Sequence, residues 1–265
     1  MSPEAPIFII LNVFSFILGV VVGSFLNVCI HRLPREESVV RPRSRCPRCG
    51  SGIRAYDNIP VLSWLILRGR CRNCGERISA IYPFVELLNG TLALFLFLRF
   101  GPSIEFLALF LFTSALVAVT FIDLEHQIIP DVISLPGIVI GFAFSFFIPT
   151  VGWGSSLAGI LAGGGSLLLV AYGYELLTKK EGMGGGDIKL LAMMGAFLGW
   201  KSIPFIIFAS SLVGSVVGIA LMLLQKKDSK LAIPFGPFLA LGAVIYIFFG
   251  DEIIHWYFSL AAPPR

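Results

Sequence analysis

Apolar runs recur eight times along the 265-residue chain, and they constrain its fold more than any other feature. A helix needs about 20 apolar residues to cross the hydrocarbon core of a bilayer, where its backbone must satisfy its own hydrogen bonds. Charged residues make up 14% of the chain, against about 25% in soluble domains. We therefore predict an all-α polytopic membrane protein with about eight transmembrane helices. The predicted spans are 7–30, 81–100, 104–122, 132–148, 156–177, 188–200, 203–224 and 232–249.

The distribution of Lys and Arg predicts how these spans are oriented. The segment 31–80 carries eleven Arg against four acidic residues, and cytoplasmic connections are enriched in basic residues. If 31–80 is cytoplasmic, both termini are periplasmic, and six lysines of two later connections also face the cytoplasm. We expect the first span to be retained, because Glu4 and no basic residue precede it. The six lysines are Lys179, Lys180, Lys189, Lys226, Lys227 and Lys230.

Four of the five cysteines form two CxxCG motifs inside the basic segment. Cys46 and Cys49 belong to the first and Cys71 and Cys74 to the second, and 21 residues separate the pairs. Four thiolates so spaced predict a closed, structural Zn²⁺ site that supplies folding free energy to 31–80. Two disulfides or redox dithiols are the alternative, which conflicts with a cytoplasmic position. Cys29, in the first span, is predicted to be a small buried apolar residue.

Two carboxylates are predicted to meet at the cytoplasmic face. Asp123 follows the third span, and Asp187 begins the sixth, directly after Gly184, Gly185 and Gly186. Ionisable groups at such depths are costly and usually functional. Two neighbouring carboxylates cannot both ionise easily, so one holds a proton while the other activates water to attack an amide. The glycines permit unusual dihedrals and close approach, which leaves room for an extended peptide.

Structural roles are the alternatives for these acidic residues. Asp187 and Asp131 each have a position that fits a helix N-cap. A cap does not explain Asp123, because the dipole at a helix C-terminus favours cations. Asp123, His126 and Asp131 could also gather a metal, but we expect His126 and Asp131 to be structural. The segment 58–67 is too short and too interrupted by proline to span, and it lies against the membrane, covers the site or packs under the zinc knot.

Taken together, the motifs resemble the type IV prepilin peptidases, the bifunctional leader peptidase/N-methyltransferases of bacterial pilus and type II secretion systems. The resemblance implies a GxGD intramembrane aspartic protease of the inner membrane, with Asp123 and Asp187 as the catalytic residues. It also implies that prepilins and pseudopilins are cut just after a glycine. The enzyme would then methylate the new amino terminus, with S-adenosylmethionine as the methyl donor. The matching motifs are Gly23-Ser24-Phe25-Leu26-Asn27-Val28, Arg32-Leu33-Pro34, both CxxCG motifs, Asn58-Ile59-Pro60, Leu62-Ser63-Trp64, Tyr82-Pro83 with Glu86, Asp123, and Gly184-Gly185-Gly186-Asp187.

The methyltransferase activity has weaker support from individual residues. No GxGxxG follows a strand, and the glycines at 163–165 lie in an apolar span, where helix packing is expected. Glu86 is the candidate for this activity, and a charge at a helix N-terminus is its alternative. Three GxxxG pairs could pack helices within one chain or between chains, so the oligomeric state is left open. These pairs are Gly19/Gly23, Gly159/Gly163 and Gly214/Gly218.

Two other classes of function compete with the peptidase. A proton-coupled transporter would place its carboxylates near the membrane midplane and favour inverted repeats, and we find no repeat. A non-catalytic assembly-platform protein would leave the pairing of Asp123 with Asp187 unexplained. Lipid and orientation account for the net charge of +4, so no nucleic-acid partner is predicted. The expected domains are a first helix at 7–30, a zinc-binding domain at 31–80 and a peptidase domain at 81–258.

Overall fold

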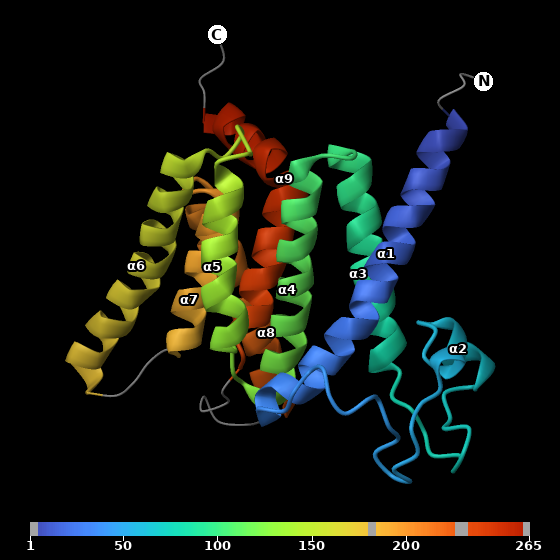
Figure 1. Ribbon diagram of the computed structural model, residues 1–265. Coiled ribbons are helices and arrows are strands. Elements are labelled where there is room, and N and C mark those ends of the chain that lie inside the picture. Colours follow the sequence, from blue (N-terminus) through green and yellow to red (C-terminus); the bar gives the residue numbers. More distant parts are fainter. Residues whose placement is uncertain (1–4, 180–183, 226–232, 262–265) are drawn as a thin grey trace. The chain divides into compact units, whose positions relative to one another are not determined.

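The structure is a computed structural model that describes residues 5–179, 184–225 and 233–261 (Figure 1). The regular elements of the described residues are all helices, and two isolated bridges beside the CxxC motifs are the only β-type pairings there, so the all-α prediction is confirmed. Gly182 and Met183 lie outside the described residues, as do four of the six lysines in the orientation argument. The helices are α1 (Ala5–Arg32), α2 (Leu62–Ile66), α3 (Ile81–Phe100), α4 (Ile104–His126), α5 (Asp131–Ser145), α6 (Trp153–Thr178), α7 (Gly185–Leu198), α8 (Ser202–Gln225) and α9 (Gly236–Ala261), with 3₁₀ turns η1 (Leu33–Arg35) and η2 (Ala55–Asp57).

Each of the eight predicted spans is a helix. Six of them, α1, α3, α4, α6, α8 and α9, are long and apolar enough to cross a membrane, which makes the chain a multi-pass membrane protein. α5 has 15 residues and α7 has 14, so the count of eight crossings stays a prediction. α4 continues four residues beyond its predicted end, which places Asp123 inside the helix. The 58–67 segment contains the five-residue helix α2 and does not span.

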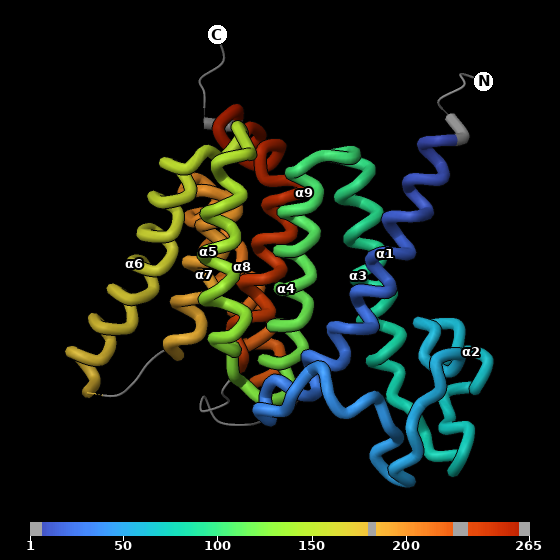
Figure 2. The backbone as a smooth tube through the Cα atoms, in the orientation of Figure 1, coloured from blue at the N-terminus to red at the C-terminus, as the bar shows by residue number. Residues whose placement is uncertain are grey.

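The chain folds as two compact units, Met1–Ala118 and Val119–Arg265, and α4 continues from the first into the second. The predicted division at 31–80 stays a prediction. In the first unit α1 packs along α3, as Figure 2 shows. A methyl group on Gly19 would lie 2.6 Å from Ala93 Cβ, and one on Gly23 would lie 2.7 Å from Glu86 Cα. This first GxxxG pair therefore packs helices within the chain, and Cys29 on α1 is buried as predicted.

In the second unit α7 packs against α5, α6, α8 and α9, and its residues from Leu190 to Phe197 are all buried. Figure 2 shows α5, α6 and α7 side by side. α6 and α7 approach most closely where Gly159 faces Gly195, because a Cβ on either residue would collide with the carbonyl of the other. Gly163 similarly faces the Leu191 carbonyl. The Gly159/Gly163 pair thus also packs helices within the chain. Of the 163–165 glycines, Gly163 and Gly164 face α7 as predicted, whereas Gly165 faces no described atom.

Replacement of Gly159 by Leu is expected to destabilise the second unit by about 1–3 kcal/mol, because added volume in a close-packed contact forces helices apart. Gly165→Leu is the matched control on the same helix, since no atom of the described residues lies within 4 Å of a Cβ placed there. The free energy of unfolding in detergent measures both variants. Equal losses for the two would contradict this account of the α6–α7 contact.

Candidate functional site

A pocket of about 270 Å³ in the second unit contains both predicted aspartates. Asp123 comes from the end of α4 and Asp187 from the start of α7, although 64 positions separate them in sequence. The connection between α4 and α5 and the first residues of α5 and α7 complete the wall. The structure therefore brings together the two residues that the sequence paired. The lining residues are Asp123, Gln127, Ile128, Ile129, Asp131, Gly184, Gly186 and Asp187.

Asp123 is 5% exposed and is held by backbone from a distant part of the chain. Its Oδ2 accepts a hydrogen bond of 3.0 Å from the amide of Gly236, the first residue of α9. Our sequence reasoning did not single out this glycine. The available signal was the Gly236-Pro237 dipeptide ahead of an apolar run, because proline favours the first turn of a helix and glycine permits close approach.

Asp187 occupies the first turn of α7 but does not cap it. The N-cap is Gly184, so the capping interpretation of Asp187 is wrong. Asp187 Oδ1 is buried and has no hydrogen-bond partner among the described residues. Asp123 lines the same pocket, and two carboxylates that share a site repel each other when both are ionised. A buried carboxylate oxygen without a structural partner is costly, which is typical of a group retained for function.

The three glycines before Asp187 differ in what they contribute. Gly184 is extended, and Gly185 and Gly186 are helical, so the expected unusual dihedrals do not occur in this segment. Close approach does occur at Gly186, where a Cβ would lie 2.8 Å from Ile129 Cβ. Gly185 has no neighbour among the described residues within 4 Å of such an atom. The segment therefore provides open space beside Asp187 through absent side chains rather than through strained backbone.

The surroundings of Asp131 and His126 are not those expected of metal ligands. Asp131 is the first residue of α5 and Pro130 is its N-cap, so the capping interpretation of Asp131 is also wrong. Its carboxylate accepts hydrogen bonds of 2.7 and 2.8 Å from Lys189 Nζ. His126 Nε2 lies 3.8 Å from Glu125 Oε1. Within the described part of the chain these residues form no metal-spaced cluster, so a metal at Asp123, His126 and Asp131 is not supported.

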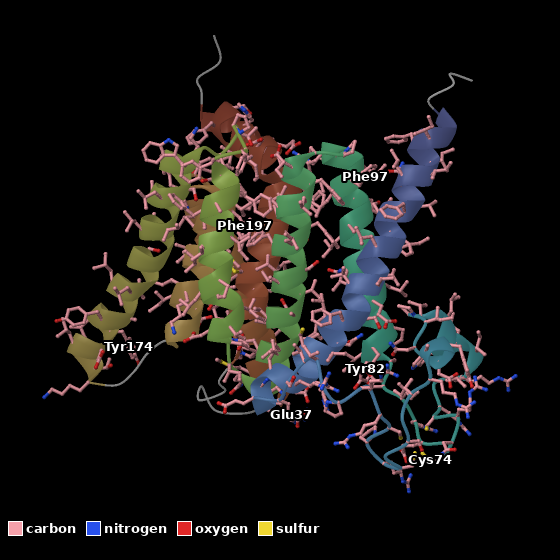
Figure 3. All side chains as sticks on the ribbon, viewed as in Figure 1. Glu37, Cys74, Tyr82, Phe97, Tyr174 and Phe197 are labelled. Carbon is pink, nitrogen blue, oxygen red and sulfur yellow. The ribbon has the colours of Figure 1, made fainter. Side chains whose placement is uncertain are left out.

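The four CxxC cysteines do form a cluster with metal-ligand spacing. Their sulfur atoms lie within 4.8 Å of one another, and Cys46 Sγ is 3.8 Å from Cys74 Sγ. Tetrahedral Zn–S bonds of about 2.3 Å space the sulfurs about 3.8 Å apart, so the cluster fits Zn²⁺. Gly50 and Gly75 follow the motifs with φ of 70° and 72°, the left-handed turns that the CxxCG pattern predicts. Figure 3 shows Cys74 in the segment between α1 and α3.

The chemistry of the sulfurs also suits a cation. All five cysteines are free, so the disulfide alternative is not realised in the structure. A hydrogen bond from the Ser51 hydroxyl lowers the pKa of Cys49 to about 6, whereas desolvation and the neighbouring thiols raise the pKa of Cys74 to about 12. Four thiolates at this spacing need a positive ion between them. Hydrogen bonds from Arg72 to Asp57 brace the segment and lower the pKa of that carboxyl.

Glu86 is a buried carboxylate in the first unit. It lies beyond the first turn of α3 and is 7% exposed, so the alternative of a helix N-terminal charge is wrong. It accepts a hydrogen bond of 2.7 Å from the Val61 amide and another from the Ser24 hydroxyl. Val61 has φ 61° and ψ −53°, and the Leu62 amide donates to the Pro60 carbonyl at 2.6 Å. Glu86 therefore holds a γ-turn that is strained for a β-branched residue.

Two family profiles match the chain, and together they cover most of it. The bacterial peptidase A24 N-terminal domain matches residues 17–100, and the type IV leader peptidase family matches residues 110–219. The first match contains the cysteine cluster and Glu86, and the second contains both aspartates of the pocket. No solved structure is significantly similar to the chain.

Curated proteins named prepilin leader peptidase/N-methyltransferase resemble the chain over most of its length. The protein of Aeromonas salmonicida (strain A449) is 42% identical over 269 residues, which cover 92% of each chain. That of Stutzerimonas stutzeri is 40% identical and covers 93% of each. That of Myxococcus xanthus (strain DK1622) is 45% identical over 80% of this chain and 63% of its own. With its pocket, its cysteine cluster and these matches, the chain belongs to the type IV leader peptidase family.

Proposed function

We propose that the chain is an intramembrane aspartic endopeptidase that removes the short basic leader of type IV prepilins and pseudopilins after a glycine. The observation that carries the proposal is the pocket in which α4 and α7 bring Asp123 and Asp187 together. The names of the curated relatives support the choice of substrate. The same names support a second step, in which the new amino terminus is methylated with S-adenosylmethionine as the methyl donor.

Hydrolysis by this pair requires one proton shared between two carboxylates. The ionised group takes a proton from water while the protonated group donates to the scissile carbonyl. Asp123 and Asp187 fit these roles because they line one open pocket, with Asp123 buried and Asp187 partly buried. Their positions also argue against a transporter, whose carboxylates lie near the membrane midplane. Asp187 is in the first turn of its helix, and Asp123 is three residues from the end of its own.

Zinc would be held by Cys46, Cys49, Cys71 and Cys74. Four thiolates leave no open coordination position, so the ion would stabilise the 31–80 domain and take no part in hydrolysis. The 81–258 segment would form the peptidase domain, behind a first helix at 7–30. By the distribution of basic residues, the zinc domain and the active site face the cytoplasm, and both termini are periplasmic. Such a chain sits in the bacterial inner membrane, where its substrates keep their leaders on the cytoplasmic side.

The test uses the full-length, zinc-loaded protein in lipid and a peptide with a Lys/Arg leader, a Gly-Phe junction and an apolar helix. We expect mass spectrometry to find one cut, directly after the glycine. With S-adenosylmethionine present, the carboxyl-terminal product should gain one methyl group. Absence of cleavage would overturn the peptidase, and a cleaved product without the methyl group would overturn the second activity.

Glu86 is our candidate for methyl transfer, supported by its burial and by the strained turn that it holds, because strain gathers at functional sites. Glu86→Gln keeps an oxygen to accept the Val61 amide but removes the charge. We expect methylation to fall about 100-fold while cleavage stays near wild type. Glu105→Gln, in the first turn of α4, is the control and should preserve both activities. If Glu86→Gln leaves methylation intact, the carboxylate only supports the turn.

A further inference from the structure

The amide of Gly236 gives the two aspartates unequal surroundings. It donates to Asp123 Oδ2 at 3.0 Å, in a contact that is fully buried. Asp187 Oδ1 is buried without any such donor among the described residues. Gly236 is also the first residue of the 26-residue helix α9, whose N-terminus carries a partial positive charge. Both effects favour negative charge on Asp123 over negative charge on Asp187.

The contact requires glycine at this position. A Cβ on Gly236 would lie 2.7 Å from Asp123 Oδ2 and 3.3 Å from Ile129 Cδ1. Ile129 also closes on Gly186, where a Cβ would lie 2.8 Å from Ile129 Cβ. One isoleucine side chain thus lies against two glycines, one beside each aspartate. The backbone of α9 is in this way held directly on the carboxylate of α4.

We infer that Gly236 is a positioning residue that keeps Asp123 ionised, so that Asp123 is the base and Asp187 carries the shared proton. The inference rests on the proposed peptidase activity. Asp123 takes a proton from water as the water oxygen bonds to the scissile carbonyl carbon, and Asp187 gives its proton to the carbonyl oxygen. In the second step the carbon–nitrogen bond breaks. The amine leaves with the proton from Asp123, and one hydroxyl of the diol returns its proton to Asp187, which restores both groups.

Other charges around the pair do not reverse this assignment. Lys189 on α7 is already committed to Asp131 on α5, with both contacts within 2.8 Å, so neither places a net charge on the pocket. His126 is on α4, three residues after Asp123. Its buried Nε2 has no hydrogen-bond partner among the described residues and lies 3.8 Å from Glu125 Oε1. The contact that distinguishes the two catalytic candidates is therefore the amide of α9.

An ester at position 236 isolates the hydrogen bond. Incorporation of glycolic acid replaces the Gly236 amide N–H by oxygen and adds no side chain. Because hydrogen bonds to charged groups are strong, we expect kcat to fall about 10- to 100-fold with little change in KM. The acid limb of the pH–rate profile should move to higher pH, since Asp123 loses the donor that favours its ionised form.

A side chain at the same position tests the steric requirement. Gly236→Ala should reduce kcat at least as much as the ester. The control is Gly214→Ala on α8, where the added Cβ would meet Phe238 at an ordinary 3.4 Å. This control should keep the wild-type rate and pH profile. The ester keeps the inference testable if the alanine variant folds poorly.

Infrared titration with ¹³C-labelled aspartate provides a readout that needs no substrate. The ester should raise the pH at which one buried carboxyl band converts to carboxylate, and Asp123→Asn should remove the band that shifts. An ester variant with wild-type kcat, pH profile and infrared titration would overturn the inference. If wild-type protein cleaves no peptide but the ester still shifts the titration, the proposed function fails and the positioning contact stands.

Discussion

Asp123→Asn and Asp187→Asn are each expected to lower kcat for prepilin cleavage by a factor on the order of 10⁴. Asparagine preserves the shape of the side chain but can neither accept a proton from water nor share one with its neighbour. The pair then lacks either its base or its acid, and both steps of hydrolysis stop. Single-turnover assays with excess enzyme in lipid measure the chemical step directly, by the rate at which the leader peptide appears.

The double variant should be no slower than the slower single variant, because groups that act as a unit lose their function together. Glu125→Gln is the matched control, on α4 two residues after Asp123 and 61% exposed at its side chain. It should cleave at the wild-type rate. If either single aspartate variant cleaves like wild type, that residue is not catalytic.

Removal of zinc is expected to unfold the cysteine-containing segment while the membrane helices stay intact. Binding of structural Zn²⁺ to small domains is worth about 10–16 kcal/mol, and the four sulfurs here lie within 4.8 Å of one another. Hydrogen exchange after chelation should show loss of protection over 40–80. Far-ultraviolet circular dichroism should change little, because α1 and α3 pack against each other without help from the metal.

Serine at any one of the four cysteines should reduce the bound zinc from one ion per chain to well below one. Cys29→Ser provides the control, because this thiol is buried in α1 and belongs to no metal-spaced cluster. Metal content by mass spectrometry and exchange over 40–80 should change together in the four variants. A metal-free protein whose 40–80 segment remains protected would contradict a zinc-dependent fold.

The sequence predicted the fold class and the pairing of the aspartates because both depend on coarse patterns. Apolar runs specify helices. Because successive spans alternate in direction, the C-terminal end of the span before Asp123 and the N-terminal end of the span that begins at Asp187 are predicted to face the same side of the membrane. The predicted end of α4 was less exact, since the apolar run stops at residue 122 while the helix continues to His126. The CxxCG spacing likewise predicted the convergence of the cysteines.

What the sequence did not reveal depends on tertiary contacts. The hydrogen bond from Gly236 to Asp123 joins residues 113 positions apart, and no local pattern encodes it. The preference of residue types for the N-cap position also failed to identify which of several neighbouring residues caps each helix. Asp131 and Asp187 are good N-cap residues by type, yet Pro130 and Gly184 occupy the cap positions. At both helices the carboxylate is moved into the first turn, where it can line the pocket.

The burial of α7 has a consequence for how bilayer thickness acts on the protein. Fourteen helical residues extend about 21 Å, well short of a hydrocarbon core of about 30 Å. A lipid-facing helix of that length would suffer hydrophobic mismatch and would thin the bilayer or tilt its neighbours. Four helices surround α7 instead of lipid. The helix that carries Asp187 is thereby insulated from mismatch. The three long helices around it, α6, α8 and α9, absorb differences between thick and thin membranes.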